Sequence, residues 1–176
     1  MLDLAQIPVL NTPRLRLRRP ELRDFDAYAA LCADPEVMRY IGDGLPQSRR
    51  RAWQAFTGML GHWAVRGYGQ FAVESVDTGA FLGRVGLYEP DPWPGTELAW
   101  ALAREHWGQG FASEAASAVR NWAFVTLRLP GIVSVIIPEN RPSIRVAEKI
   151  GERFHRDDKI DGIAVRIYAV DNPTSA

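Results

Sequence analysis

A strand, a glycine-bearing turn and a long helix, predicted between residues 96 and 127, constrain this chain more than any other feature. The strand, residues 96–102, is apolar and aromatic-rich. The helix is predicted from about Ala112 to about Leu127, where apolar side chains recur at the spacing that buries one helix face. In the turn, Gly108 and Gly110 allow the backbone to direct several N–H groups at one point. A helix N-terminus adds partial positive charge, so the turn predicts a phosphate or pyrophosphate site, with an ordinary turn as the alternative.

This stretch resembles the acyl-CoA-binding motif of the GNAT superfamily of N-acetyltransferases. The family pattern is Gln/Arg-x-x-Gly-x-Gly/Ala at a strand–helix junction. Here Trp107 stands at the first position, where Gln or Arg is usual. The branch of ribosomal-protein N-terminal acetyltransferases typically carries Trp there, followed by Gly-x-Gly-aromatic-Ala-Ser/Thr-Glu-Ala, and residues 107–115 match that pattern. The resemblance extends over about residues 12–170.

The resemblance implies which residues bind acetyl-CoA as a cosubstrate. Backbone N–H groups of the turn and the first helical turn would hold the pyrophosphate, namely those of Gly108, Gln109, Gly110, Phe111, Ala112 and Ser113, and Trp107 would belong to the same cofactor site. The edge of the preceding strand would hold the pantetheine amides, through Trp100, Ala101 and Leu102. Downstream, Asn140-x-x-Ser143 leads to Lys149-x-Gly151 and resembles a second family motif, whose Asn contacts the pantetheine arm. Taken alone, Asn140 also fits a helix cap and Ser143 a solvated first-turn residue.

Two residues are candidates for catalysis. Glu97 opens the central strand, as a Glu commonly does in the resembling branch, and a strand carboxylate at nearly the same offset is the base of GNAT histone acetyltransferases. Alternation places Glu97 on one face with Ala99 and Ala101, which leaves room for an acceptor. Partial burial would raise the pKa of Glu97 towards the working range of a base. The alternative is a structural ion pair with an arginine.

The general acid is less clear, because Ala147 stands where many family members carry a tyrosine that protonates the leaving thiolate. Ser143, or a water that it orders, is therefore the candidate acid. The sequence offers no obvious covalent nucleophile, which favours direct attack by the amine on the thioester. The histidines and the single cysteine lack metal-ligand spacing, so we expect no metal.

The predicted function is an acetyl-CoA-dependent N-acetyltransferase that acts on a primary amine. The alternative is a catalytically silent acyl-CoA-binding module for sensing or assembly, which the alanine at position 147 keeps open. The acceptor stays open among a protein N-terminus, an antibiotic amine, a polyamine and an amino acid. The family makes a homodimer possible.

The predicted fold class is α/β of the α+β kind, with a mixed, mostly antiparallel sheet flanked by helices. The resemblance implies the GNAT fold, in which two central strands splay apart around the pantetheine arm. A dinucleotide-binding fold is disfavoured because the turn lacks the third glycine of its fingerprint. We expect a loose leader over residues 1–11 and a single domain over residues 12–176.

Four local expectations concern the remaining chain. The alternating segment 14–18 predicts a half-buried strand with its three arginines in solvent. A helix is expected to start at Pro20 with Leu22 on its apolar face. Phe154 is expected to fill the space of the family Phe that Glu152 replaces. A hairpin is predicted over residues 159–170.

Composition limits location and partners. Lys plus Arg and Asp plus Glu number 21 each, so the net charge is zero and general nucleic-acid binding is disfavoured. The single cysteine, Cys32, excludes an internal disulfide and is expected in the core. The N-terminus lacks a signal-peptide pattern, and no apolar run is long enough to span a membrane. We therefore expect a cytoplasmic protein.

Overall fold

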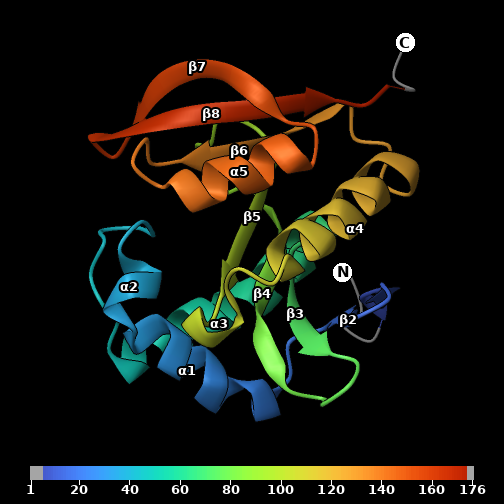
Figure 1. Cartoon of the computed structure of the whole chain (residues 1–176), viewed down its shortest axis with the longest axis vertical. Coiled ribbons are helices and arrows are strands. Elements are labelled where there is room, and N and C mark those ends of the chain that lie inside the picture. The colour runs from blue at the N-terminus through green and yellow to red at the C-terminus, as the bar shows by residue number, and fades with distance from the viewer. Residues whose placement is uncertain (1–5, 174–176) are drawn as a thin grey trace.

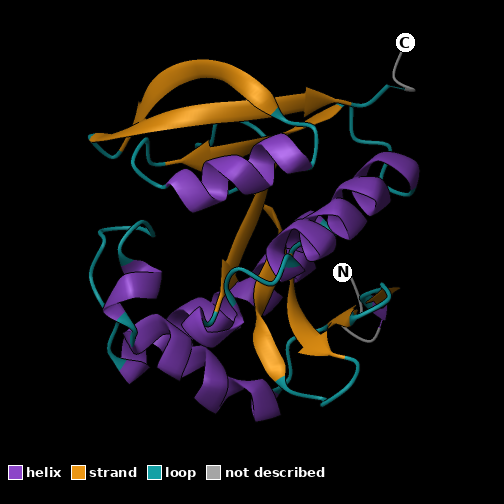
Figure 2. Ribbon diagram, viewed as in Figure 1, coloured by secondary structure: helices purple, strands orange, loops and turns teal. Residues whose placement is uncertain are grey.

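The computed structural model describes residues 6–173 as one eight-stranded sheet with helices packed against it (Figures 1 and 2). The strand order is β1-β2-β3-β4-β5-β6-β8-β7, and every neighbouring pair is antiparallel except β5 and β6. The strands are β1 (Leu10–Asn11), β2 (Leu15–Arg18), β3 (Gln70–Ser75), β4 (Phe81–Tyr88), β5 (Glu97–Leu102), β6 (Gly131–Ile136), β7 (Arg153–Ile160) and β8 (Ile163–Asp171). The helices are α1 (Phe25–Ala33), α2 (Pro35–Met38), α3 (Arg49–Arg66), α4 (Phe111–Val125) and α5 (Arg141–Lys149). The predicted mixed, mostly antiparallel sheet flanked by helices is confirmed.

The two parallel strands pair over a very short length. Their register contains one pair, Glu97 opposite Val133, after which β5 stays on β4 and β6 stays on β8. Figure 1 shows β5 running at a steep angle to β6, away from the layer formed by β6, β8 and β7. The strands therefore splay apart directly after Glu97, which is where the family geometry requires a gap.

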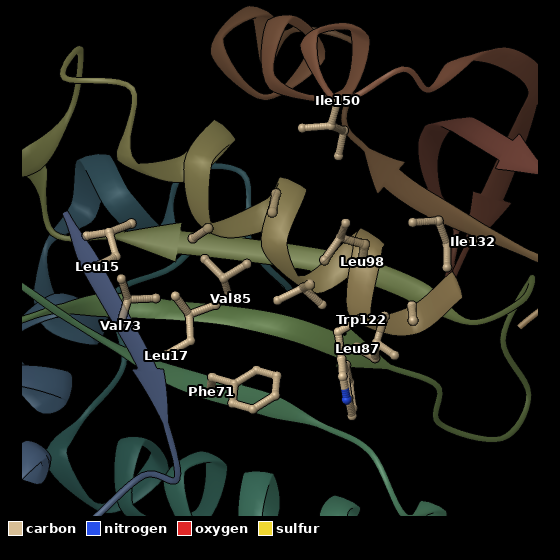
Figure 3. Close-up of a cluster of buried hydrophobic side chains, with 14 of the residues drawn as sticks. Leu15, Leu17, Phe71, Val73, Val85, Leu87, Leu98, Trp122, Ile132 and Ile150 are labelled. Atoms are coloured by element: carbon tan, nitrogen blue, oxygen red, sulfur yellow. The ribbon is translucent and has the colours of Figure 1, made fainter. Parts of the chain in front are cut away.

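The two faces of β5 serve different clusters of buried side chains, as its alternation predicts. Leu98 and Leu102 belong to the main core under α4. Figure 3 shows Leu98 in this core together with Trp122 of that helix. Ala101 belongs to a second cluster formed with α1 and α3. Because consecutive residues point to opposite faces, Glu97 shares the α1–α3 face with Ala101.

The N-terminal part differs from the prediction in two places. The strand β1 pairs with β2, and Ile7 is buried in the main core, so residues 7–11 of the leader expected over residues 1–11 are part of the fold. Residues 1–5 of that leader lie outside the described residues. A 3₁₀ turn, Leu22–Asp24, precedes α1, and Leu22 is exposed rather than on an apolar face.

Arg18 is buried, which contradicts its predicted place in solvent. Its guanidinium forms two hydrogen bonds of 2.7 Å with Asp24 and a third of 2.8 Å with Glu74 on β3. Arg14 and Arg16 are exposed, as expected. The error arose because strand alternation describes one strand alone, whereas the two carboxylates that compensate the buried charge come from other segments.

The C-terminal hairpin is longer than the predicted segment 159–170. Its first strand, β7, extends back to Arg153 because the charged residues before 159 pair with β8 without apolar alternation to mark them. Phe154 is 52% exposed, so the expectation that it fills the family phenylalanine's space is wrong. Glu152 itself is buried at that place.

Candidate active site

A cavity of about 1090 Å³ opens where β5 and β6 separate. Four of the predicted site residues line it together: Glu97, Trp100, Asn140 and Ser143. Its wall also includes residues of α3, β4, β6 and the loops that follow α2 and β4. Ala101, Leu102 and the segment 107–113 lie outside this lining. The structure thus brings the two candidate catalytic residues to one cavity and places the cofactor turn beyond it.

Glu97 is a buried carboxyl on the wall of this cavity. Its Oε2 accepts a hydrogen bond of 2.8 Å from the indole nitrogen of Trp93, and its carboxylate also accepts from the backbone N–H of Val135. Burial raises the pKa of Glu97 to about 7, against the lowering effect of these hydrogen bonds and of the charge of Arg84. Arg84 donates instead to Gln70, and no arginine forms an ion pair with Glu97 among the described residues. The ion-pair alternative is therefore not realised.

The loop before β5 contributes more than a surface turn. Its Trp93 packs edge-on against Tyr88, with ring centroids 5.6 Å apart, and both residues line the cavity. Tyr88 of β4 lies opposite Glu97 of β5. Trp93 therefore contacts both Tyr88 and Glu97, and the three side chains lie together on the cavity wall. The sequence showed this loop to be rigid and aromatic, but its contact with Glu97 could not be read from spacing.

Asn140 and Ser143 meet β5 across the gap. The side-chain oxygen of Asn140 accepts from the backbone N–H of Ser143 at 3.2 Å, so Asn140 caps α5. The indole nitrogen of Trp100 donates to Ser143 Oγ at 3.3 Å. Ala147 is fully buried at the usual tyrosine position, and its side chain carries no hydroxyl. Of the serines in the two motifs, Ser113 and Ser143, Ser143 is therefore the one that lines the cavity.

The predicted pyrophosphate turn has the backbone that its glycines suggest. Gly108 and Gly110 have φ of +74° and +81°, and α4 begins at Phe111, one residue earlier than predicted. The indole nitrogen of Trp107 donates to the carbonyl of Leu102 at 2.8 Å, which ties the turn to the end of β5. The N–H groups of the first helical turn have no partner within the helix and remain available to an anion.

The edge of β5 that faces β6 carries few free polar groups. Ala103 N donates to the carbonyl of Leu82, and antiparallel pairing alternates, so the backbone groups of residues 98, 100 and 102 turn towards the gap. The carbonyl of Leu98 accepts from Ser134, and that of Leu102 accepts from Trp107. The backbone of Trp100 is therefore the part of this edge best suited to pair with amides. The backbone of Ala101 turns towards β4.

Arg14 was not recognised as a site residue from the sequence. Its guanidinium donates to the carbonyl of Gln109 at 3.0 Å and forms an ion pair of 2.6 Å with Glu114 of α4. Thr12 donates to the same carboxylate at 2.6 Å, and Arg14 also lies over the ring of Phe111. Although burial opposes it, these contacts hold the pKa of Glu114 below its ordinary value. No local pattern could have paired residues 100 positions apart.

The described part of the chain contains no group of three His, Cys, Asp or Glu side chains that could hold a metal ion. Within it, none of the helices has the length and apolar character needed to cross a membrane.

Comparisons with known proteins identify the family of the chain. Residues 14–153 match the family described as "Acetyltransferase (GNAT) domain". The "Uncharacterized N-acetyltransferase p20" of Bacillus licheniformis is 32% identical over 165 residues, which are 90% of this chain and 92% of that protein. An acetyltransferase from Agrobacterium tumefaciens str. C58 is 37% identical and superposes with a TM-score of 0.84, over 94% of this chain and 95% of that one.

The ribosomal-protein acetyltransferase branch appears among the structural neighbours. Mycobacterium smegmatis RimJ in complex with CoA-disulfide is 20% identical and has a TM-score of 0.74, over 94% of this chain and 86% of that one. At this identity the likeness shows a shared fold alone. Taken with the family match and the closer relatives, it supports one conclusion: this chain belongs to the GNAT family of acetyl-CoA-dependent N-acetyltransferases.

Proposed function

We propose that this protein transfers an acetyl group from acetyl-CoA to a primary amine by direct attack, with Glu97 as the general base. The observation that carries this proposal is a buried carboxyl on the cavity wall whose pKa is raised to about 7. A base works best when its pKa is near the operating pH, because it is then ionised and still able to take a proton. Trp93 and Val135 hold this carboxylate in one orientation.

The remaining roles follow from the positions of the other site residues. The N–H groups of residues 108–113 would hold the pyrophosphate, and the free backbone groups of Trp100 would pair with the pantetheine amides. Asn140 would keep the first turn of α5 in place beside the pantetheine arm. Ser143 faces the cavity and is the proposed donor of a proton to the thiolate, directly or through a water.

The acceptor is proposed to be a protein N-terminus or a small-molecule amine. An α-amine, with a pKa of about 8, is about a tenth neutral at pH 7, whereas a lysine-like amine with a pKa of about 10.4 is almost wholly protonated. On the cavity wall, the carboxylates of Asp43 and Glu89 form ion pairs with Arg51 and Arg66. Those of Asp91 and Asp161 are therefore the ones proposed to attract a cationic amine before it loses its proton.

An acceptor screen tests the proposal. Free thiol is measured with acetyl-CoA and, in turn, peptides with free N-termini, polyamines, aminoglycosides and amino acids. We expect at least one class to raise thiol release in proportion to acetylated product, and we expect Glu97→Gln to abolish most of that release. Binding of acetyl-CoA without transfer to any acceptor would instead favour the catalytically silent module.

A further inference from the structure

Glu152 is a buried carboxyl that the proposed mechanism does not use. It follows Gly151 at the end of α5 and is 2% exposed. Its Oε1 lies 3.0 Å from Ser134 Oγ on β6, and its Oε2 is buried without a hydrogen-bond partner. A carboxylate in this position would leave one charged oxygen bare, at a large desolvation cost. The site therefore suits a neutral carboxylic acid.

The hydrogen bonds of Ser134 lead to the same protonation state. Ser134 Oγ lies 2.8 Å from the carbonyl oxygen of Leu98 as well as 3.0 Å from Glu152 Oε1. A hydroxyl has one proton, and a carbonyl oxygen can only accept. Ser134 satisfies Leu98 with its own proton, so the proton between Ser134 and Glu152 has to come from Glu152. The result is a chain from the Glu152 carboxyl through Ser134 to Leu98.

This chain lies at the point where β5 and β6 part. The last paired residues of the two strands are Glu97 and Val133. Ser134, the next residue of β6, donates to the carbonyl of Leu98, the next residue of β5. Val135 then donates its N–H to the Glu97 carboxylate. Side-chain hydrogen bonds thus continue the contact between the strands by one residue after backbone pairing ends.

We propose that Glu152, in its neutral form, is a positioning residue that ties β5 to β6 through Ser134 and so fixes both the width of the gap and the place of Glu97. This proposal rests on the proposed function, in which the gap between β5 and β6 holds the pantetheine arm of acetyl-CoA. Ionised Glu152 would no longer donate to Ser134, which would then turn its proton to Glu152 and release Leu98. It would also add a second negative charge near Glu97.

The charges around Glu152 support a transition on the alkaline side. Burial raises the pKa of Glu152 to about 8, and the negative charge of Glu97 raises it too. The hydrogen bond with Ser134 and the positive charge of Arg120 on α4 lower this pKa. Arg120 itself donates to the carbonyl of Ile150. The other ionisable neighbours line a small cavity beside Glu152 and come from α5, β7 and β8: Glu148, Arg153 and Tyr168.

The test compares wild type with Glu152→Gln and Ser134→Ala, without any acceptor. Acetyl-CoA affinity is measured by calorimetry at pH 6.5 to 9.5. In wild type we expect affinity to fall as Glu152 ionises, by several-fold above pH 8. The amide of Glu152→Gln donates to Ser134 at every pH, so its affinity should stay high throughout. Ser134→Ala lacks the link at every pH, so its affinity should stay low throughout. Equal pH dependence in all three proteins would overturn the proposal.

A second measurement reports the proton directly. In ¹³C NMR of side-chain-labelled glutamate, one carboxyl of the wild type should titrate near pH 8, and that signal should be absent from Glu152→Gln. Glu148→Gln, an exposed carboxyl on α5, is the matched control and should keep the signal. A Glu152 resonance that titrates near pH 4.5, the ordinary range of a glutamate, would overturn the proposal whatever the acetyl-CoA affinities of the variants. Both measurements remain decisive if the acceptor screen finds no substrate.

Discussion

Trp93 and Glu97 are joined by a hydrogen bond of 2.8 Å from the indole nitrogen to the carboxylate, four residues apart across the start of β5. The bond lies on the wall of the cavity, where burial has raised the pKa of the carboxyl to about 7. A hydrogen bond to an ionised carboxylate stabilises the charged form. Trp93 therefore increases the ionised fraction of the Glu97 carboxyl, the proposed base, at neutral pH.

Trp93→Phe removes this donor and keeps an aromatic ring. The pKa of Glu97 should rise further, so the acid limb of kcat/KM should move to higher pH by about one unit, since a hydrogen bond to a charged group contributes about 1.5 kcal/mol or more. The rate at alkaline pH should be close to that of the wild type. An acid limb that stays in place would show that Trp93 has no influence on the base.

Glu97→Gln removes the proposed base. We expect kcat/KM near neutrality to fall by about 100-fold or more, and the acid limb to flatten. The remote variant Asp77→Asn, in the turn between β3 and β4, should retain full activity. A Glu97→Gln enzyme that keeps both its rate and its acid limb would assign the proton to water and leave Glu97 a structural residue.

The same substitution should change how stability depends on pH. Folded Glu97 holds its proton more tightly than the unfolded chain does, because its pKa is raised from 4.5 to about 7. Its contribution to stability is therefore present below about pH 4.5 and is lost as pH rises to about 7. Urea unfolding at pH 5 and pH 8 should show a larger loss for wild type than for Glu97→Gln. Equal losses would mean that the carboxyl is ionised in the folded protein at pH 5.

Ser143→Ala tests the proton donor. We expect kcat to fall by about tenfold or more while acetyl-CoA affinity changes little, because the hydroxyl is proposed to act on the thiolate and not on the bound cofactor. Ser143→Thr keeps a hydroxyl and should restore part of the rate. Wild-type kcat in Ser143→Ala would reduce Ser143 to a hydrogen-bond partner of Trp100.

Gly110→Val tests the pyrophosphate turn. A side chain at φ of +81° costs about 1–2 kcal/mol of stability, and it would also crowd the phosphates. Acetyl-CoA affinity should fall by at least about tenfold, or about 1.4 kcal/mol. Gly67→Val is the matched control, since Gly67 ends α3 with φ of +78° in open space. It should lose similar stability and keep its affinity, and calorimetry on both proteins separates strain from binding.

Arg14→Gln tests the contacts that join Arg14 to the Gln109 carbonyl of the turn and to Glu114 of α4. The ion pair with Glu114 is half exposed, so its loss should cost less than about 1 kcal/mol of stability. Release of the Gln109 carbonyl should nevertheless weaken acetyl-CoA by about three- to tenfold, or about 1 kcal/mol. Arg156→Gln, which breaks an exposed pair with Asp158 on β7, should leave affinity unchanged. Equal affinity in both variants would limit Arg14 to surface stability.

The sequence predicted best where local spacing decides the structure. The strand expected over residues 96–102 is β5, Glu97–Leu102, and the helix expected from Ala112 is α4, which begins at Phe111. Period-two alternation, helical spacing and paired glycines are all signals within one element. The GNAT family and its fold followed from a motif with the same local character.

The sequence predicted worst where a polar side chain depends on a distant partner. Arg18 is compensated by Glu74, 56 residues away, and Arg14 by Glu114, 100 residues away. Glu152 occupies a place usual for an apolar residue, and its hydrogen-bond partner is Ser134 on β6, 18 residues away. Alternation and helix periodicity describe burial along one element, so they contain no information about such pairs.

The contact between the β1–β2 loop and α4 has a consequence for how the protein folds during synthesis. Thr12 and Arg14 have left the ribosome long before Glu114 is synthesised, because 100 or more residues separate them. Contacts of such high sequence separation form late, since the entropy of closing the loop has to be paid first. The contacts of Thr12 and Arg14 with Glu114 are therefore expected among the late steps of folding. We expect acetyl-CoA, by binding the neighbouring turn, to stabilise the folded protein.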